Sequence, residues 1–305
     1  MGSYLFRRAF RALLVVLGVS FISFAVLFLS GDPTDTMVGE DWTIEEVQKL
    51  RRDMGLDRPW FIQYLTYVSR AVRGDFGESL RYRQPAFKLI AERIPATLEL
   101  ASLALVISVV LALPLGIVSA TMRGSVYDHG GMIFALFGQS MPVFWLGLML
   151  ILVFGVHLGW LPVSGRGGIE KLVLPSITLA TYSLARNTRV IRSSMLDVLG
   201  QDYVRTARAK GLTEQAIIYI HALRNSLIPV VTIIGLEFGH LLGGAVIVET
   251  IFAWPGIGRL MIQAVYAKDF PLVQASVTVA ALIFVTLNFF VDFIYSYLDP
   301  RIRVR

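Results

Sequence analysis

The stretch YVRTARAKGLTEQAIIYIHALRNSLIP, Tyr203 to Pro229, is a basic, helix-forming interruption in a chain that is apolar almost everywhere else. It is followed at once by the apolar run VVTIIGLEFGHLLGGAVIV, residues 230–248. Its first part predicts a short helix that ends at Gly211, since glycine suits the left-handed position after a helix. Thr213 is placed to cap a second short helix, with Glu214 in the first turn, where the helix dipole favours a carboxylate. The stretch therefore predicts a helix–turn–helix that projects from a set of apolar helices.

The composition of the whole chain is that of an integral membrane protein. Of its 305 residues, 55% are hydrophobic and 16% are charged, whereas soluble domains carry about 25% charged residues. The net charge of +6 could suit nucleic acid, but membrane proteins concentrate Lys and Arg in cytoplasmic loops, so membrane lipid and no nucleic acid is expected. There is no cysteine, which excludes disulfides, thiolate catalysis and cysteine-based zinc sites.

Six weakly charged runs are long enough to cross the hydrocarbon of a bilayer, which takes about 20 helical residues. The sequence therefore predicts an all-α integral membrane protein with six transmembrane helices. The first run is longer than the core of a cleaved signal peptide, so it is expected to be retained. The fourth is polar for a helix in lipid, and we expect it to face the interior of the bundle. The runs are 10–29, 97–121, 131–156, 172–193, 228–250 and 275–297.

Basic residues near the ends of the runs predict the orientation, because Lys and Arg accumulate in short cytoplasmic loops. With the N-terminus inside, the seven basic residues from Arg186 to Arg224 and three at each terminus lie in the cytoplasm. The short loops on the other side hold only Arg166, Lys171, Arg259 and Lys268. Both termini are therefore expected in the cytoplasm. The expected segments are a first transmembrane helix (1–30), an extracytoplasmic helical loop (31–94), a transmembrane domain (95–297) with a cytoplasmic coupling loop (196–227), and a cytoplasmic tail (298–305).

The long loop after the first run contains signals for short amphipathic helices. Thr43 to Glu46, TIEE, is typical of a capping box, and the helix that follows it is predicted to end at Gly55. Pro59 is expected to open a second helix that stops near Gly74. We expect these helices to lie on the outer surface, either as a structural cover of the bundle or in contact with a soluble partner.

Four acidic residues lie within or at the edges of the runs, where an ionisable group lines a pathway or is paired inside the bundle. Glu99 and Glu237 are the candidates for a substrate pathway, whereas Glu249 and Asp292, at the edges, suit a structural or solvated role. A proton-driven secondary transporter that uses Glu99 or Glu237 is an alternative. It should show repeat-related halves with broken helices, which we do not detect.

Smaller motifs point to packing and not to chemistry. Gly235, Gly239 and Gly243 recur at four-residue spacing, which lets helices pack closely within this chain or against a second one. The four histidines lack the spacing of metal ligands, and His240 is expected to be a buried hydrogen-bonding group. No catalytic or metal-binding residue is predicted. No G-x-x-x-x-G-K-[ST] loop occurs in these 305 residues, so no phosphate-binding loop of that kind is predicted on this chain.

Several motifs together resemble the permease subunits of ABC importers for dipeptides, oligopeptides, nickel or glutathione. In the loop pattern E-A-A-x-x-x-G of that family, Arg205, Thr206 and Ala207 stand at the first three positions and Gly211 at the glycine, so the acidic first position is changed. The other motifs are weak singly, but their order along nearly the whole chain is specific. They are GDP at Gly31, GDFG at Gly74, TLELA at Thr97, TRVIRSSMLDVL at Thr188, ETIFAWPGIGRL at Glu249 and LDPRIR at Leu298.

The resemblance implies the type I ABC importer transmembrane fold in a prokaryotic cytoplasmic (inner) membrane. It implies a second homologous permease, two cytoplasmic ATPases that hold ATP and Mg, and an extracytoplasmic binding protein that delivers the substrate. The expected substrate is a di- or oligopeptide, with nickel or glutathione as alternatives, and no cofactor is expected on this chain. The outer loop after Glu249 would face the binding protein or anchor the membrane interface. The implied residues are Tyr203, Arg205, Thr206, Ala207, Ala209, Gly211 and His221 for ATPase coupling, and Trp254, Pro255, Gly256 and Gly258 in the outer loop.

Overall fold

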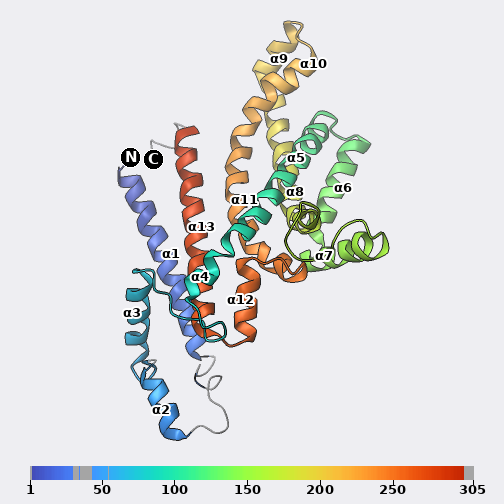
Figure 1. The fold of residues 1–305 in the computed structure, drawn as a ribbon. Coiled ribbons are helices and arrows are strands. Elements are labelled where there is room, and N and C mark those ends of the chain that lie inside the picture. Colours follow the sequence, from blue (N-terminus) through green and yellow to red (C-terminus); the bar gives the residue numbers. More distant parts are fainter. Residues whose placement is uncertain (1, 30–33, 35–42, 54, 299–305) are drawn as a thin grey trace. The chain divides into compact units, whose positions relative to one another are not determined.

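The computed structural model describes residues 2–29, 34, 43–53 and 55–298, and helices without any strand make up this part of the chain (Figure 1). It divides into two compact units, which are described separately. The first unit contains residues up to Thr97 together with Pro255–Phe290, and the second contains Leu98–Trp254 and the last turns of the helix Phe270–Leu298, from Val291 onward. The predicted tail at 298–305, apart from Leu298, lies outside the described residues.

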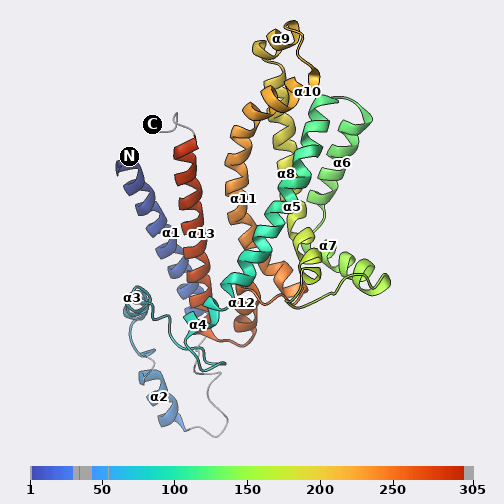
Figure 2. The same cartoon turned by 45° about the horizontal axis from the view of Figure 1, so that its top comes forward.

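The first unit is built around two long apolar helices that run antiparallel, side by side in both ribbon views (Figures 1 and 2). Short helices surround the end of this pair that lies away from the N-terminus. The long helices are α1 (Gly2–Leu29) and α13 (Phe270–Leu298), and the others are α2 (Ile44–Asp53), α3 (Trp60–Ala71), α4 (Ala86–Ala91), the start of α5 (Ile94–Thr121) and α12 (Ile257–Tyr266).

The predicted start signals of the short helices are confirmed. At α2, the Thr43 backbone N–H donates to Glu46 Oε2 at 2.8 Å, and the Glu46 N–H donates to Thr43 Oγ1 at 3.4 Å, which is a capping box. The hydrogen bond from the Thr43 backbone lowers the pKa of the Glu46 carboxyl. Pro59 directly precedes α3, and Gly55 and Gly74 have φ of 70° and 83°, in the left-handed region expected after a helix.

Helix α3 lies against the two long helices of the first unit. Tyr64 Oη donates to the Leu17 carbonyl oxygen at 3.0 Å, and Leu17 lies about 18 Å before the end of α1. On the other side, Tyr67 Oη lies 2.8 Å from Thr278 Oγ1 of α13. Helix α3 therefore contacts the sides of both long helices through its tyrosines, while none of its residues is buried, and the expected role as a cover or as a contact for a soluble partner stays a prediction.

The loop before α4 and the turn between α12 and α13 are joined through one buried carboxylate. Asp269 is 1% exposed and accepts hydrogen bonds from Ser79 Oγ and from the backbone N–H groups of Arg81 and Leu272, both at 3.2 Å. Phe76, Ile90, Leu260 and Leu272 are among the apolar residues buried beside it. The network holds the two loops at the end of the unit in one arrangement.

The second unit contains four long helical stretches and a projecting helical turn. In both views α8 and α11 run side by side, and α9 and α10 extend beyond the ends of their neighbours (Figures 1 and 2). The elements are the rest of α5, α6 (Val126–Ser140), α7 (Val143–Leu150), the π-helix η2 (Ile151–His157), α8 (Glu170–Leu199), α9 (Asp202–Ala209), α10 (Glu214–Ala216), the π-helix η3 (Ile217–Ala222) and α11 (Leu223–Ile251).

Helix α8 is the predicted fourth run, and it lies inside the unit as expected. Ser176, Thr178, Asn187 and Thr188 are each at most 1% exposed. Thr178 and Thr188 donate to the carbonyl oxygens four residues earlier at 2.8 Å, which satisfies hydroxyls that lipid could not. The polar side of this run is thus enclosed by neighbouring helices.

Small residues on the surrounding helices let them approach α8 closely. A Cβ atom added at Gly116 would lie 2.6 Å from Ile191 Cγ2, and one at Gly138 would lie 2.6 Å from Thr181 Cγ2. On α11 the close contact is at Gly244, with 3.3 Å to Leu179 Cδ1. The expectation of close packing within the chain at Gly243 is wrong, because nothing lies within 4 Å of its added Cβ. The open face at Gly243 is available to a second chain.

The predicted third run, 131–156, is not one straight helix. It consists of α6 and of α7 with η2, which meet at a bend of 102°. The break falls at Met141, whose ψ of 133° is extended, and at Pro142, which begins α7. Proline disfavours the helical conformation of the residue that precedes it, and Met141 follows this preference because its backbone is extended. Pro114, Pro175 and Pro229 lie inside continuous helices.

Among the described residues, four helices are long and apolar enough to cross a membrane, and the bent pair passes the same test when taken together. They are Arg7–Leu29, Ala86–Thr121, Pro229–Ile251 and Phe270–Val291, with Val126–His157 as the pair. Helix α8 is about 45 Å long, enough to cross, but it is too polar to stand among them. With α8 included, these helices correspond to the six predicted runs.

The close approach at Gly116 yields a stability prediction. We expect Gly116→Ala to destabilise the protein by about 1–3 kcal/mol, since the added methyl group must displace Ile191. Gly243→Ala is the matched control, and it should be neutral or stabilising because alanine favours helix and meets open space. Unfolding of the two variants in detergent measures the difference, and equal stability would contradict the packing described for α8.

Candidate functional site

The Tyr203–Pro229 stretch forms a projection from the second unit, made of α9, the turn at Gly211, and α10 (Figures 1 and 2). Gly211 has a φ of 79°, and Thr213 Oγ1 accepts a hydrogen bond from the Ala216 N–H at 3.4 Å. Both local predictions are confirmed. The second helix is not separate, however, because α10 continues through η3 into α11 without a break. We call α9, the turn and α10 the projection.

The projection has a small core of its own. Val204 and Ile217 are fully buried and pack with Ala207, which is 7% exposed, and with Leu199 at the end of α8. Ala207, one of the residues implied for ATPase coupling, therefore faces the inside of the projection, and direct contact of its side chain with a partner is not expected. Its small size serves the packing of α9 on η3.

An ion pair closes the turn from the outside. Arg208 donates from Nε to Glu214 Oε1 at 2.6 Å and from Nη2 to Oε2 at 3.2 Å. The hydrogen bonds from Arg208 lower the pKa of the Glu214 carboxyl, so the pair persists at neutral pH and is lost as pH falls through that lowered pKa. Both side chains are exposed, so salt screens the pair and its contribution to stability is small.

Tyr203 and His221 join the base of the projection to the start of α11. Asn225 Nδ2 donates to Tyr203 Oη at 2.8 Å and to the His221 carbonyl oxygen at 3.1 Å. His221 therefore contributes its backbone oxygen to this junction. These contacts hold the start of α9 against the start of α11.

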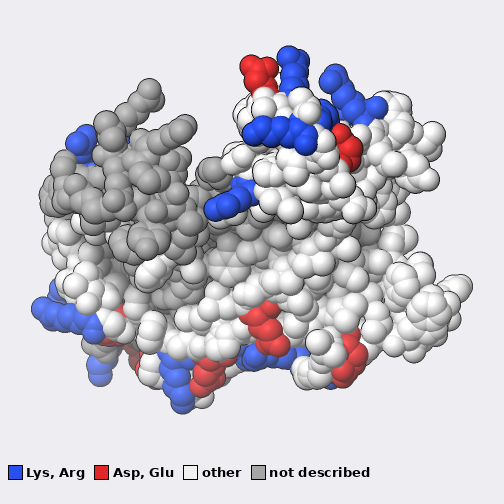
Figure 3. Space-filling view, turned by 90° about the horizontal axis from the view of Figure 1, so that it is seen from above, with Lys and Arg blue, Asp and Glu red and all other residues white. Residues whose placement is uncertain are grey.

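The outward face of the projection is small and basic. Arg205, Thr206 and Ala209 are exposed. The Thr206 hydroxyl donates to the Asp202 carbonyl oxygen at 3.0 Å, so the Thr206 side chain lies close to the backbone of α9 and protrudes little. Figure 3, seen from the end that carries α9 and α10, shows Lys and Arg side chains gathered over the projection. This face combines positive charge with small side chains.

The predicted outer-loop residues lie mostly inside the protein. Trp254 is 1% exposed, Gly256 and Gly258 are buried, and Pro255 is half-buried. They form the turn into α12, with Gly256 in extended conformation directly before the helix. In this structure they shape the loop, and contact with a binding protein stays a prediction.

Glu99, one of the two predicted pathway residues, is paired near the outer-loop end of the second unit. Arg166 Nη2 lies 2.6 Å from Glu99 Oε2, and the Arg166 guanidinium stands 6.0 Å from the centre of the Trp254 ring. Both charged side chains are about two-fifths exposed, at 40% and 42%. The group links α5, the loop after η2 and the end of α11.

Glu237, the other predicted pathway residue, is fully buried halfway along α11. It accepts a hydrogen bond from Ser183 Oγ at 2.7 Å and forms an ion pair with Arg186 Nη1 at 2.8 Å. Arg186 lies about 24 Å from the start of α8, near its middle, so its assignment to the cytoplasmic loop is wrong. Its side chain is 38% exposed, and charged groups within membrane-spanning bundles rarely face hydrocarbon.

Two further ionisable groups are placed differently from the sequence-based expectation. His240 on α11 is exposed and not buried, because no described part of the chain covers that face. Glu249 is 0% exposed, which agrees with a structural role and not with a solvated one. Asp292, the fourth acidic residue, lies among side chains outside the described set.

Sequence reasoning missed a second buried ion pair, between α6 and α8. Arg192 donates from Nε and Nη2 to the two oxygens of Asp128 at 2.7 and 2.8 Å. Asp128 Oδ2 also accepts from the Gly124 N–H at 3.0 Å, and Asp128 is 2% exposed. The signal available in the sequence was an acidic residue just before the third run and an arginine at the end of the fourth. Among the described residues, no group of three potential metal ligands comes together.

Comparisons with known proteins agree with this architecture. Residues 112–304 match the family "Binding-protein-dependent transport system inner membrane component", and residues 1–101 match its N-terminal component. The chain is 40% identical to the dipeptide transport system permease protein DppB of Alkalihalophilus pseudofirmus, across 99% of this chain and all of the relative. It is 41% identical to the di/tripeptide transport system permease protein DppB of Pseudomonas aeruginosa, across 99% of each chain.

Solved structures share the fold at low sequence identity. The MetNI methionine ABC transporter in an inward-facing conformation superimposes with a TM-score of 0.58 at 20% identity, over 69% of this chain and 96% of that one. An amino acid ABC transporter crystallised with histidines gives a TM-score of 0.52 at 18% identity, over 69% and 94%. The architecture is thus that of a type I ABC importer transmembrane subunit. The chain belongs to the family of inner membrane components of binding-protein-dependent transport systems, and within it to the DppB type of ABC permease.

The buried ion pair of the second unit yields a prediction. We expect Arg186→Leu to destabilise the protein by about 3 kcal/mol, because it leaves Glu237 buried without a counter-charge. The double variant Arg186→Leu, Glu237→Leu should recover most of that loss. Arg166→Leu is the control, and removal of this exposed partner of Glu99 should cost less than about 1 kcal/mol. Unfolding in detergent gives the three values, and additive losses in the double variant would contradict the pairing.

Proposed function

We propose that this chain forms half of the pathway through which an ABC importer moves short peptides into the cytoplasm. A second homologous permease supplies the other half, two cytoplasmic ATPases bind and hydrolyse ATP with Mg, and an extracytoplasmic binding protein delivers the peptide. Both termini and the projection lie in the cytoplasm. The family assignment favours this over the secondary transporter considered from the sequence, because the relatives are ABC permeases.

The observation that carries the proposal is the shape and support of the projection. It has its own buried core, a capped turn and an ion pair across that turn, so it keeps its form while pressed against another protein. Its outward face offers Thr206 and Ala209, whose small side chains suit insertion into a cleft of the ATPase. Because η3 continues into α11, movement of the ATPase would pass directly to a helix that crosses the membrane.

The pathway is proposed to run along the face of α8 and α11 that bears Arg186. This side chain is 38% exposed in the isolated chain at mid-membrane depth, where lipid contact is excluded by the cost of burying charge. The second permease is proposed to cover the remaining open face of α11 at Gly243 and His240. The two chains together would enclose a polar route.

Peptides are the proposed substrate because the similar permeases at about 40% identity are named for dipeptide or di/tripeptide transport. A free peptide carries a carboxylate, and the partly exposed Arg186 guanidinium offers a partner for it. Nickel and glutathione remain the alternatives within the same permease role.

Docking of the ATPase tests both the surface and the orientation. We expect Ala209→Trp to reduce binding of the ATPase about tenfold, since bulk on the outward face blocks insertion. Removal of Arg301–Arg305 is the control and should have little effect. The measurement is recovery of added ATPase on sealed inverted vesicles, where the cytoplasmic side is outside. Binding to right-side-out vesicles instead, or loss with the truncated tail alone, would overturn the assignment.

The substrate is tested with the complete complex in liposomes, including its binding protein. We expect dipeptides to stimulate ATP hydrolysis and to accumulate in the lumen. A dipeptide blocked at both ends by acetyl and amide groups is the control and should be transported poorly. Stimulation by nickel or glutathione without any by peptides would replace the substrate while leaving the permease role intact.

A further inference from the structure

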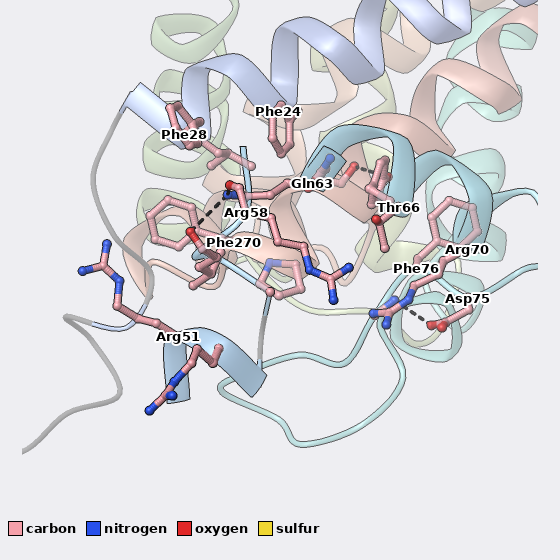
Figure 4. Close-up of a pocket in the computed structure, with 18 residues that line it drawn as sticks. Phe24, Phe28, Arg51, Arg58, Gln63, Thr66, Arg70, Asp75, Phe76 and Phe270 are labelled. Atoms are coloured by element: carbon pink, nitrogen blue, oxygen red, sulfur yellow. Dashed lines mark hydrogen bonds between the residues drawn. The ribbon is translucent and has the colours of Figure 1, made fainter. Parts of the chain in front are cut away.

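A cavity of about 490 Å³ lies within the first unit, at the end of α1 and α13 that is away from the N-terminus (Figure 4). Its walls come from α1, α2, α3, the turn at Asp75–Gly77 and the start of α13. This volume is within the range of sites that hold small molecules. Nothing in the proposed transport cycle uses it.

The floor of the cavity is apolar and continuous with the transmembrane helices. Its apolar residues are Phe24, Leu27 and Phe28 on α1, Phe76 in the turn, and Phe270 on α13. Leu29 is the last residue of α1 and Phe270 the first of α13, so the floor lies where the hydrocarbon of the bilayer ends. On α3, Phe61 and Leu65 are 49% and 63% exposed, which continues the apolar surface outside the cavity.

The rim of the cavity is strongly basic. Arg51, Arg52, Arg58 and Arg70 line it, against one carboxylate, Asp75. Figure 4 shows the Arg58 side chain extending over the cavity. Among the described residues, Arg52, Arg58 and Arg70 form no ion pair, and Arg52 Nε donates to the Gln48 carbonyl oxygen at 3.3 Å. Guanidinium groups in such a cluster favour a phosphate, which accepts several of their hydrogen bonds at once.

We propose that this cavity binds an anionic phospholipid from the leaflet at the Leu29 end of α1. The phosphate lies among Arg52, Arg58 and Arg70, and an acyl chain lies against the phenylalanines of α1 and α13. A free phosphate would leave the apolar floor uncovered, and a neutral lipid would leave Arg52, Arg58 and Arg70 without a counter-charge. The bound lipid joins α2 and α3 to the two transmembrane helices.

The test uses the full chain purified in nanodiscs that contain phosphatidylglycerol and phosphatidylcholine, with a photoreactive phosphatidylglycerol probe. We expect the probe to crosslink to the chain near α3, and the double variant Arg58→Gln, Arg70→Gln to reduce crosslinking about tenfold. The control is Arg73→Gln, Lys88→Gln, which removes two exposed charges that do not line the cavity and should leave crosslinking unchanged. Equal loss in both double variants would overturn the proposal in favour of general surface charge.

Two further arms separate the lipid from other occupants. Thr66→Phe keeps every arginine and fills the cavity from α3, so it should reduce crosslinking to the lipid. Millimolar inorganic phosphate should not compete with the probe, and full competition would show that the site takes a free anion. The chain segment between α1 and α2 carries Asp32, Asp35, Glu40 and Asp41. If amide variants of these four residues raised crosslinking severalfold, the segment and not a lipid would be the native occupant.

Discussion

A charge halfway across a membrane must be neutralised by its surroundings, and the pairing of Arg186 with Glu237 meets that constraint here. The pair holds the middle of α8 against the middle of α11, with Ser183 supporting the carboxylate. Because α8 also buries serine, threonine and asparagine side chains, it cannot be turned toward lipid. Its neighbours must enclose it, and they do so with glycines at Gly116, Gly138 and Gly244 where the backbones come closest.

The projection, which belongs to the same unit, also has a defined structure of its own. The projection packs Val204, Ala207 and Ile217 together and is closed by Arg208 and Glu214, so its form does not require a partner. Binding is less costly when the bound shape already exists, because little conformational freedom is lost. A site that receives force from another protein benefits for the same reason, since a soft element would absorb the movement.

Much of this arrangement could be predicted from the sequence, because local rules determine it. The left-handed turn at Gly211, the cap at Thr213 and the capping box at Thr43 depend on residues within a few positions of one another. The inward polar side of α8 follows from the exclusion of polar groups from lipid. The motifs that resemble ABC importer permeases then placed these elements in one family.

The remaining features depend on contacts between distant residues. Arg186 was assigned to a loop because the rule for basic residues considers position along the chain and not a partner on another helix. Pro142 breaks its helix while Pro114, Pro175 and Pro229 do not, and only the neighbouring helices distinguish these cases. In the sequence Ala207 resembles a surface residue, but in the fold it is buried against Ile217. In each case the deciding interaction joins segments that are separate in sequence.

The continuity of α10, η3 and α11 has a mechanical consequence. The helical rod from Glu214 to Ile251 continues through the π-helix η3 without a break, and Glu237 stands about 35 Å from its tip at Glu214. If the rod pivots at that tip, a tilt of only about 5° moves Glu237 by about 3 Å, as the rise per residue of a helix requires. The ion pair to Arg186 measures 2.8 Å. A tilt too small to disturb the shape of the rod is therefore large enough to separate Arg186 from Glu237, if it is directed away from α8.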